Sequence, residues 1–230
     1  IILLGMSVSG AFYSQFHRKT DISITGSSFE ADLEDGFDLL FEYENDTYFM
    51  ANDSVHVDEL WKYNGTIATL VSDINPGSGD SYPYKFVEYG GDMYFNADDG
   101  VHGEELWKYD GTTTSLVHDI NGGASSSDVG AFFEYNGGLY FNADDGVHGE
   151  ELWKYDGSTV SLVEDVNVGG ASSHPREFTE FQGSLYFSDV TGSLYKYDGN
   201  QVTNIYSNQN TLMWLTVIGG DLFFTNHANI

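Results

Sequence analysis

Short apolar runs separated by turn residues recur along the chain, and they predict β-strands. In residues 131–176 the runs FFEY and LYFN flank the turn Asn136-Gly137-Gly138, and the runs LWKY and VSLVEDV flank Asp156-Gly157-Ser158. Runs this short, rich in Tyr, Phe, Trp and Val and joined by Asn-Gly or Asp-Gly, are typical of β-hairpins. Helical repeats would instead carry a periodicity of about 3.6 residues through each unit. The unit therefore predicts two hairpins, or four strands.

The unit repeats every 46 residues. Trp61, Trp107 and Trp153 are separated by equal steps (107 − 61 and 153 − 107), and each lies in ELWKY followed by Asn-Gly or Asp-Gly. Copies of the surrounding sequence occupy residues 50–65, 96–111, 142–157 and, in shortened form, 194–199. The second and third copies are identical. A period of about 40 to 50 residues made of short strands is typical of β-propeller blades.

We predict an all-β fold: one five-bladed β-propeller over residues 1–230, with four-stranded blades of 46 residues. Four blades occupy residues 39–84, 85–130, 131–176 and 177–210. The fifth blade is split, with its first hairpin from residues 211–230 (LTVI and LFFT) and its second from residues 8–38 (AFYSQF and DISIT). Strands from both chain ends close the ring of a propeller and hide its edges. Five times 46 equals the 230 residues of the chain.

One observation favours a different blade count. Residues Ile1–Met6 also read as a second strand, with LLGM aligned to LYFN, and this strand would duplicate the LFFT near the C-terminus. On that interpretation the chain is an excerpt from a larger propeller.

The charge balance excludes several kinds of partner. The chain has 36 Asp and Glu residues against 8 Lys and Arg, which gives a formal net charge of −28. Such a surface repels nucleic acid and anionic membranes, and the apolar segment Ile1–Met6 is too short to span a bilayer. The acidity suits divalent cations, a saline habitat or simple solubility. With no cysteine, a thiol nucleophile, a thiolate metal site and a disulfide are all impossible.

The repeats resemble the bacterial and archaeal ELWxxDGT repeat family, through ELWKYDGT at residues 105–112 and ELWKYDGS at 151–158. The resemblance extends into the family's LVxDINPG segment, matched by LVSDINPG at 70–77, LVHDINGG at 116–123 and LVEDVNVG at 162–169. It implies a part of a large secreted or surface protein and no particular activity. The fourth unit departs from the pattern, with Tyr195 in place of Trp and a shortened acidic loop, so a site carried by that loop should be missing there. In size and blade number the chain is also similar to tachylectin-type sugar-binding propellers.

The loop between the two hairpins concentrates oxygen donors. Hard oxygen ligands with an interposed glycine suit Ca²⁺, which is the candidate cofactor. The predicted metal ligands are Asn96, Asp98, Asp99, Glu104, Asn142, Asp144, Asp145 and Glu150. The spacing differs from that of an EF-hand, and Asp and Asn also build turns by accepting hydrogen bonds from their own backbone, so turn building is the alternative interpretation.

A histidine recurs in the same loop, and a glutamate recurs in the first strand. His56, His102 and His148 could ligate a transition metal, hydrogen-bond a sugar or only hold the loop. The first-strand residues Glu42, Glu88, Glu134 and Glu180 are predicted to line the central channel in a ring that Val217 interrupts. Carboxyl pairs can hydrolyse glycosides, but catalysis needs two acids in different environments, so a channel-bound cation or water cluster is the preferred interpretation.

The repeated tryptophans have two interpretations. Their aromatic faces suit sugar stacking, whereas their position in the middle of a strand favours packing between blades. No nucleophile elbow, phosphate-binding glycine loop or HExxH motif is present.

We therefore predict a non-enzymatic extracellular or cell-surface module for binding or adhesion. Its repeated loops would bind glycans, or another surface protein, with Ca²⁺ as the candidate ion and with strength gained by multivalency. The first alternative is a structural subunit of a surface layer or filament that self-associates. The second alternative is a glycosidase of the five-bladed type.

Overall fold

The computed structural model describes residues 40–53, 55–207 and 211–227, and every regular element in these ranges is a β-strand. Sheet one contains β1 (Leu40–Tyr43), β2 (Asp46–Ala51), β3 (Glu59–Tyr63) and β4 (Ala68–Ser72). Sheet two contains β5 (Tyr84–Tyr89), β6 (Asp92–Asp98), β7 (Glu104–Tyr109) and β8 (Thr114–His118). Sheet three contains β9 (Gly130–Tyr135), β10 (Gly138–Asp144), β11 (Glu150–Tyr155) and β12 (Val160–Glu164). Sheet four contains β13 (Arg176–Phe181), β14 (Ser184–Ser188), β15 (Leu194–Tyr197) and β16 (Val202–Tyr206), and sheet five contains β17 (Thr211–Ile218) and β18 (Asp221–His227).

Strand order follows chain order within every sheet, and all neighbouring strands are antiparallel. The prediction of an all-β fold built from four-stranded repeats is confirmed for sheets one to four. The predicted closure of a fifth blade depends on residues 8–38, which lie outside the described residues. No helix that could cross a membrane is found in the described part of the chain.

The hairpin turns form where the sequence predicts them. Between β9 and β10, Asn136 has φ 48° and Gly137 has φ 71°. Positive φ at both central residues defines the type I′ turn, and its twist matches that of the two flanking strands. Asn tolerates this left-handed conformation better than most residues and Gly adopts it without a Cβ clash, which explains the Asn-Gly sequence.

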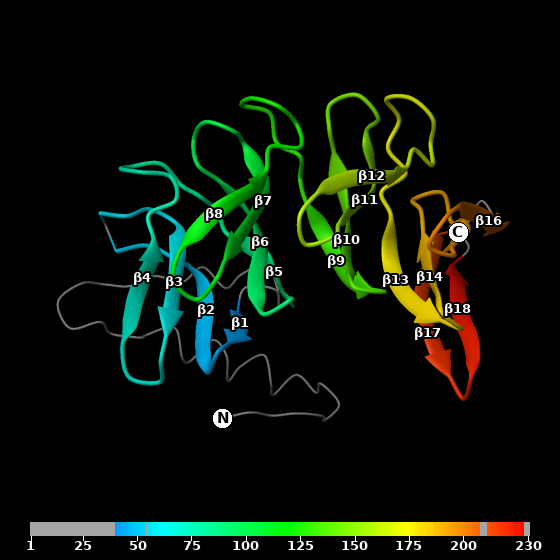
Figure 1. Cartoon of the computed structure of the whole chain (residues 1–230), viewed down its shortest axis with the longest axis horizontal. Coiled ribbons are helices and arrows are strands. Elements are labelled where there is room, and N and C mark those ends of the chain that lie inside the picture. The colour runs from blue at the N-terminus through cyan, green and yellow to red at the C-terminus, as the bar shows by residue number, and fades with distance from the viewer. Residues whose placement is uncertain (1–39, 54, 208–210, 228–230) are drawn as a thin grey trace.

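Consecutive sheets pack face to face in chain order, as Figure 1 shows from left to right. The first strands β1, β5, β9, β13 and β17 contact one another in that order. This succession of four-stranded sheets around their first strands is propeller-like.

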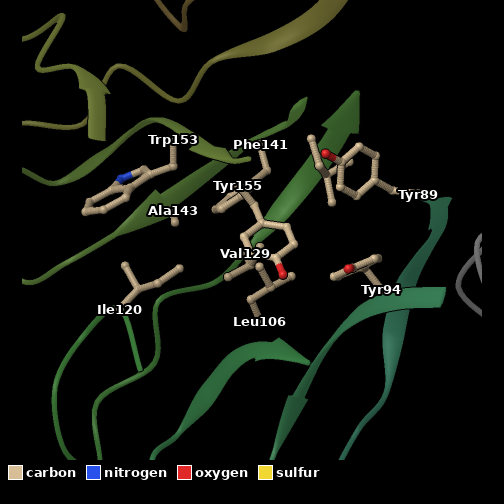
Figure 2. Close-up of a cluster of buried hydrophobic side chains, with 10 residues drawn as sticks. Tyr89, Tyr94, Leu106, Ile120, Val129, Phe141, Ala143, Trp153 and Tyr155 are labelled. Atoms are coloured by element: carbon tan, nitrogen blue, oxygen red, sulfur yellow. The ribbon is translucent and has the colours of Figure 1, made fainter. Parts of the chain in front are cut away.

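Apolar side chains fill the space between neighbouring sheets. Figure 2 shows Tyr94 and Leu106 of sheet two packed with Phe141, Trp153 and Tyr155 of sheet three. Trp153 is 8% exposed and Phe141 is 0% exposed. Full burial of one such side chain contributes about 1.5–3 kcal/mol. Trp107 takes the same place between sheets one and two, so the expectation that the repeated tryptophans pack between blades is confirmed for these two. The described neighbours of the third, Trp61, all belong to sheet one.

Candidate functional site

Three equivalent loops join the second and third strands of sheets one, two and three, and an aspartate organises each of them. In sheet two, Asp99 Oδ1 accepts hydrogen bonds from the backbone N–H groups of Val101 and His102, both at 2.9 Å. Asp145 accepts the same pair in sheet three at 2.9 and 2.8 Å, and Asp53 does so in sheet one at 3.0 and 2.8 Å. Such turns form locally because a short carboxylate reaches its own backbone two and three residues on.

The same aspartate also fixes the imidazole ring. His102 Nδ1 lies 2.8 Å from Asp99 Oδ2 and His148 Nδ1 lies 2.7 Å from Asp145 Oδ2. In sheet one His56 Nδ1 lies 3.1 Å from Asp53. Because a carboxylate accepts at Nδ1, the tautomer with the proton on Nδ1 is favoured. The Nε2 atom of each ring has no hydrogen-bond partner among the described residues.

Electrostatics strengthen these pairs. The hydrogen bond to Asp99 raises the pKa of His102 against the opposing effect of desolvation, and the nearby charges of Asp99 and Asp119 add to the rise. The pKa of Asp99 is lowered, because hydrogen bonds from His102 and the backbone outweigh the effect of its burial, which acts in the other direction. The pKa of His148 is raised and that of Asp145 is lowered by the corresponding contacts in sheet three.

An exposed valine precedes the histidine in each loop. Val55, Val101 and Val147 are 68%, 63% and 66% exposed, and the side chains of the three histidines are 29%, 34% and 36% exposed. Each loop therefore presents a small apolar group beside an oriented imidazole. We call this arrangement the Val–His–Asp tip.

The predicted calcium ligands are divided among separate contacts. Asn96 Nδ2 donates to Glu104 Oε2 at 2.9 Å and Asn142 Nδ2 donates to Glu150 Oε1 at 2.5 Å, so these pairs are brought together. The Asp98 and Asp144 carboxylates each accept the N–H two residues on, at 2.7 Å.

The turn-building interpretation therefore accounts for all four aspartates. Among the described residues, no three His, Asp or Glu side chains are gathered as metal ligands. The side-chain oxygens of Asn96 and Asn142 are buried and have no hydrogen-bond partner among the described residues. The calcium site stays a prediction.

The sequence interpretation missed a buried carboxylate next to these residues. Glu105 is 0% exposed and accepts hydrogen bonds from Ile120 N–H at 2.9 Å, Asn121 N–H at 3.1 Å and the Ser127 hydroxyl at 2.7 Å. Burial raises the pKa of Glu105 to about 7, although these hydrogen bonds oppose the rise. The bonds fix the connection that leads from sheet two into sheet three. Glu59 makes the equivalent three bonds, and Glu151 accepts hydrogen bonds from Val166 N–H and from the N–H and hydroxyl of Ser173.

Signals for this contact exist in the repeat. The glutamate directly before Leu-Trp in each of the three repeats is followed by a serine 22 residues later (81 − 59, 127 − 105, 173 − 151). We call this contact the glutamate latch.

The four first-strand glutamates are exposed and occupy one register position. Glu88 pairs with Met93, Glu134 with Leu139 and Glu180 with Leu185. Val217 takes the same place opposite Leu222. The structure therefore puts them at equivalent positions of neighbouring strands, as the channel interpretation requires, but it gives no member a distinct environment.

Sheet four lacks the Val–His–Asp tip. Its shortened loop closes on Asp189, which is 4% exposed and accepts hydrogen bonds from Thr191 N–H at 2.9 Å, Ser193 N–H at 2.8 Å and the Tyr195 hydroxyl at 3.1 Å. No histidine is present in this loop. Within residues 40–227 as described, the tip therefore occurs in three consecutive sheets.

Comparisons with known proteins leave the family open. No protein-family model matches the chain, and a search of curated proteins finds no match. The chain is similar to the computationally designed Ika8 protein, with TM-score 0.47, 15% identity and coverage of 82% of this chain and 57% of that chain. It is also similar to the computationally designed Ika4 protein (TM-score 0.40, 15% identity, 66% of this chain and 94% of that chain) and to the tricorn protease (TM-score 0.37, 14% identity, 81% and 19%). The resemblance to the ELWxxDGT repeat family stays a prediction.

Proposed function

We propose that the chain is a non-enzymatic binding or adhesion module that acts outside the cell or at the cell surface, and that its Val–His–Asp tips bind glycans. One observation supports this most directly: the same exposed valine and the same oriented imidazole recur on equivalent loops of three consecutive sheets.

The chemistry of the tip suits a sugar. A pyranose ring has an apolar face of C–H groups and a rim of hydroxyls. Val101 offers an apolar contact, and His102 Nε2 offers a hydrogen-bond acceptor at a fixed place when Nδ1 carries the proton. The net charge of −28 repels acidic polymers, so the ligand class is neutral glycan.

Three tips of low individual affinity give strong binding to a polymer. Linked sites raise overall avidity by about 10²–10⁴ when the ligand spans them. Loops of near-identical sequence on consecutive sheets suit a ligand that is itself a repeat. Ca²⁺ is not required by the proposal, because the groups it invokes are the valine and the imidazole of each tip.

Binding to immobilised neutral polysaccharides tests the proposal. His102→Ala and His148→Ala should each weaken binding several-fold, and the double variant should weaken it by more than the product of the two, since avidity is lost. His118→Ala is the matched control, because His118 is exposed on β8 and belongs to no tip. Unchanged binding in the double variant, or an equal loss in His118→Ala, contradicts the proposal.

We also propose that the ring has five blades. The support is that sheet five repeats the first hairpin of the other sheets and that the remaining chain before β1 contains two further strand-like runs.

A glycosidase is not proposed, since the four first-strand glutamates are equivalent and an acid and a base must differ.

A further inference from the structure

The turn between β3 and β4 of sheet one carries an asparagine where the equivalent turns carry an aspartate. Asn64 Oδ1 accepts hydrogen bonds from the backbone N–H groups of Thr66 and Ile67, both at 3.0 Å. Asp110 Oδ1 in sheet two accepts the same pair of bonds at 2.9 and 2.8 Å. The corresponding residues of sheets three and four, with the same pair of bonds, are Asp156 and Asp198. The four turns share one geometry, and sheet one differs by holding a neutral amide.

The residue after Asn64 leaves its side chain open to attack. Asparagine is thermolabile, most of all before glycine, where no side chain hinders the following backbone nitrogen. Gly65 has φ 87°, and a Cβ added there would meet no atom within 4 Å. The Gly65 N–H has no hydrogen-bond partner among the described residues. This nitrogen is therefore free to bond to Asn64 Cγ and close a succinimide ring.

The two hydrogen bonds to Asn64 Oδ1 favour this ring closure. Negative charge develops on Oδ1 when a nucleophile adds to Cγ, and donors already aimed at that oxygen stabilise the charge. The donors are the N–H groups of Thr66 and Ile67, which the turn itself holds in place. The turn acts on its own asparagine as an oxyanion hole acts on a substrate.

We infer that Asn64 is a site of spontaneous deamidation. Gly65 N loses its proton to the solvent and bonds to Asn64 Cγ, the Cγ–Nδ2 bond breaks, and the amide nitrogen takes up a proton and leaves as ammonia. Water then adds to the succinimide. Cleavage of its Cγ–N bond gives aspartate at position 64, and cleavage of its backbone C–N bond gives isoaspartate. The inference is independent of glycan binding by the tips.

The aspartates of the equivalent turns are protected from the same ring closure. A carboxylate is a poor electrophile, so an aspartate reacts only when its side chain is protonated. Hydrogen bonds from the N–H groups of Thr113 and Thr112 lower the pKa of Asp110, and hydrogen bonds within its own turn lower the pKa of Asp156. An aspartate formed from Asn64 would accept the same bonds as a charged group, which strengthens them. This product is therefore stable against a second round of reaction.

Two other asparagines precede a glycine in the described residues, and both are placed differently. Asn121 Nδ2 donates to the Ser126 carbonyl at 2.9 Å, so its amide nitrogen is held in place. Asn136 lies in the turn between the paired residues Tyr135 and Gly138. No donor reaches Asn136 Oδ1 among the described residues. We expect Asn64 to react first.

Peptide mass mapping of the full-length folded chain during storage in mildly alkaline buffer tests the inference. Asn64 should show the mass change of an amide-to-acid conversion at least about tenfold faster than Asn121 and Asn136, because hydrogen bonds to a developing charge are stronger than neutral ones. Chromatography separates the aspartate and isoaspartate peptides, and released ammonia gives a second readout. In denaturant the three rates should converge, since the turn is lost.

Asp110→Asn moves the reactive amide into sheet two. It places an asparagine before Gly111 under the same two donors, so position 110 should deamidate at a rate similar to that of Asn64. Asn64→Asp is the matched control and should show no ammonia release from position 64. Circular dichroism establishes that both variants fold.

Three outcomes overturn the inference. The first is equal conversion of Asn64, Asn121 and Asn136 in the folded chain. The second is an unreactive position 110 in folded Asp110→Asn. The third is a lead of Asn64 that persists in denaturant, because the reaction would then depend on the local sequence and not on the turn.

Discussion

The hydroxyl of Tyr89, at the end of the first strand of sheet two, donates a hydrogen bond of 2.8 Å to the carbonyl of Gly137 in the first turn of sheet three. Tyr43 makes the same bond to Gly91 at 2.7 Å, and Tyr135 makes it to Gly183 at 2.8 Å. The next member of the series is Phe181, which has no hydroxyl to donate. Sheets four and five are instead joined by a 3.1 Å bond from Thr179 Oγ1 to the Leu215 carbonyl.

Loss of one such bond should destabilise the protein measurably. We expect Tyr89→Phe to lower the free energy of unfolding by about 0.5–1.5 kcal/mol, because it removes one hydrogen bond and little apolar area. Phe181→Tyr should raise it by a similar amount if the new hydroxyl reaches the Gly220 carbonyl. Denaturant melts followed by tryptophan fluorescence measure both changes. Tyr63→Phe is the control, since the Tyr63 hydroxyl has no hydrogen-bond partner within the described ranges of the chain; an equal effect there would contradict the assignment.

The glutamate latch should make stability depend on pH. The pKa of Glu105 is raised from 4.5 to about 7 in the folded protein, so the folded state binds this proton more tightly than the unfolded state does. Its contribution is fully present below pH 4.5 and is lost as pH rises to about 7.

We therefore expect Glu105→Gln to be less stable than the natural chain at low pH and to lose less stability between pH 4.5 and 7. Melting temperatures of both proteins between pH 4.5 and 7 measure this difference in pH dependence. Parallel curves for the two proteins would show that Glu105 does not titrate in that window.

The Val–His–Asp tip predicts a shift in histidine titration. Because the folded-state pKa of His102 is raised above its ordinary value of 6.5, the pair with Asp99 stabilises the loop below that pH and loses the contribution as pH rises through the folded pKa. Asp99→Asn should bring the midpoint of His102 down in an NMR titration and leave that of His148 unchanged. Equal movement of both histidines would indicate a global effect on the fold instead.

A cation in sheet three lacks the partner that its counterparts have. Lys108 Nζ lies 2.9 Å from Asp92, and Lys62 Nζ lies 2.8 Å from Asp46. The equivalent position in sheet three is Gly138, and Lys154 lies instead over the Tyr140 ring at 5.5 Å.

Gly138→Asp should restore the pair. A Cβ at this position meets the Lys154 Cε at 2.5 Å, and the end of a flexible lysine can move. We expect a gain of about 0.5–1 kcal/mol in unfolding free energy, partly because the unfolded chain loses the freedom of a glycine. Gly138→Asn is the control, because it replaces the glycine without adding a charge, and chemical denaturation measures both variants. If Gly138→Asn raises the unfolding free energy as much as Gly138→Asp does, the gain does not come from the ion pair.

The local features of the fold could be predicted from the sequence, because they depend on neighbouring residues. The Asn136-Gly137 turn follows from backbone sterics and the burial of Trp153 follows from the repeat. The grouping of Asp98 and Asp99 around one ion is not found, since each carboxylate reaches a backbone N–H in its own turn first.

The glutamate latch could not be predicted from local pattern, because its donors lie 15 to 22 residues away on a different connection. The same holds for Tyr89 and Gly137, which are 48 residues apart. Contacts of this range become visible only when the sheets are placed beside one another. Exposure of the loop valines also escaped the sequence interpretation, because nothing in an apolar residue itself marks it as a surface group.

The glutamate latch has a consequence for how such a chain grows. Each latch joins the third strand of one sheet to the connection that leads into the next, so a duplicated unit carries both halves of its own junction. Units can then be gained or lost by recombination without redesign of any interface. Sheet four has Ser193 in place of the glutamate and does not carry that junction, so a copy of this unit would lack the contact that joins the other units to their neighbours.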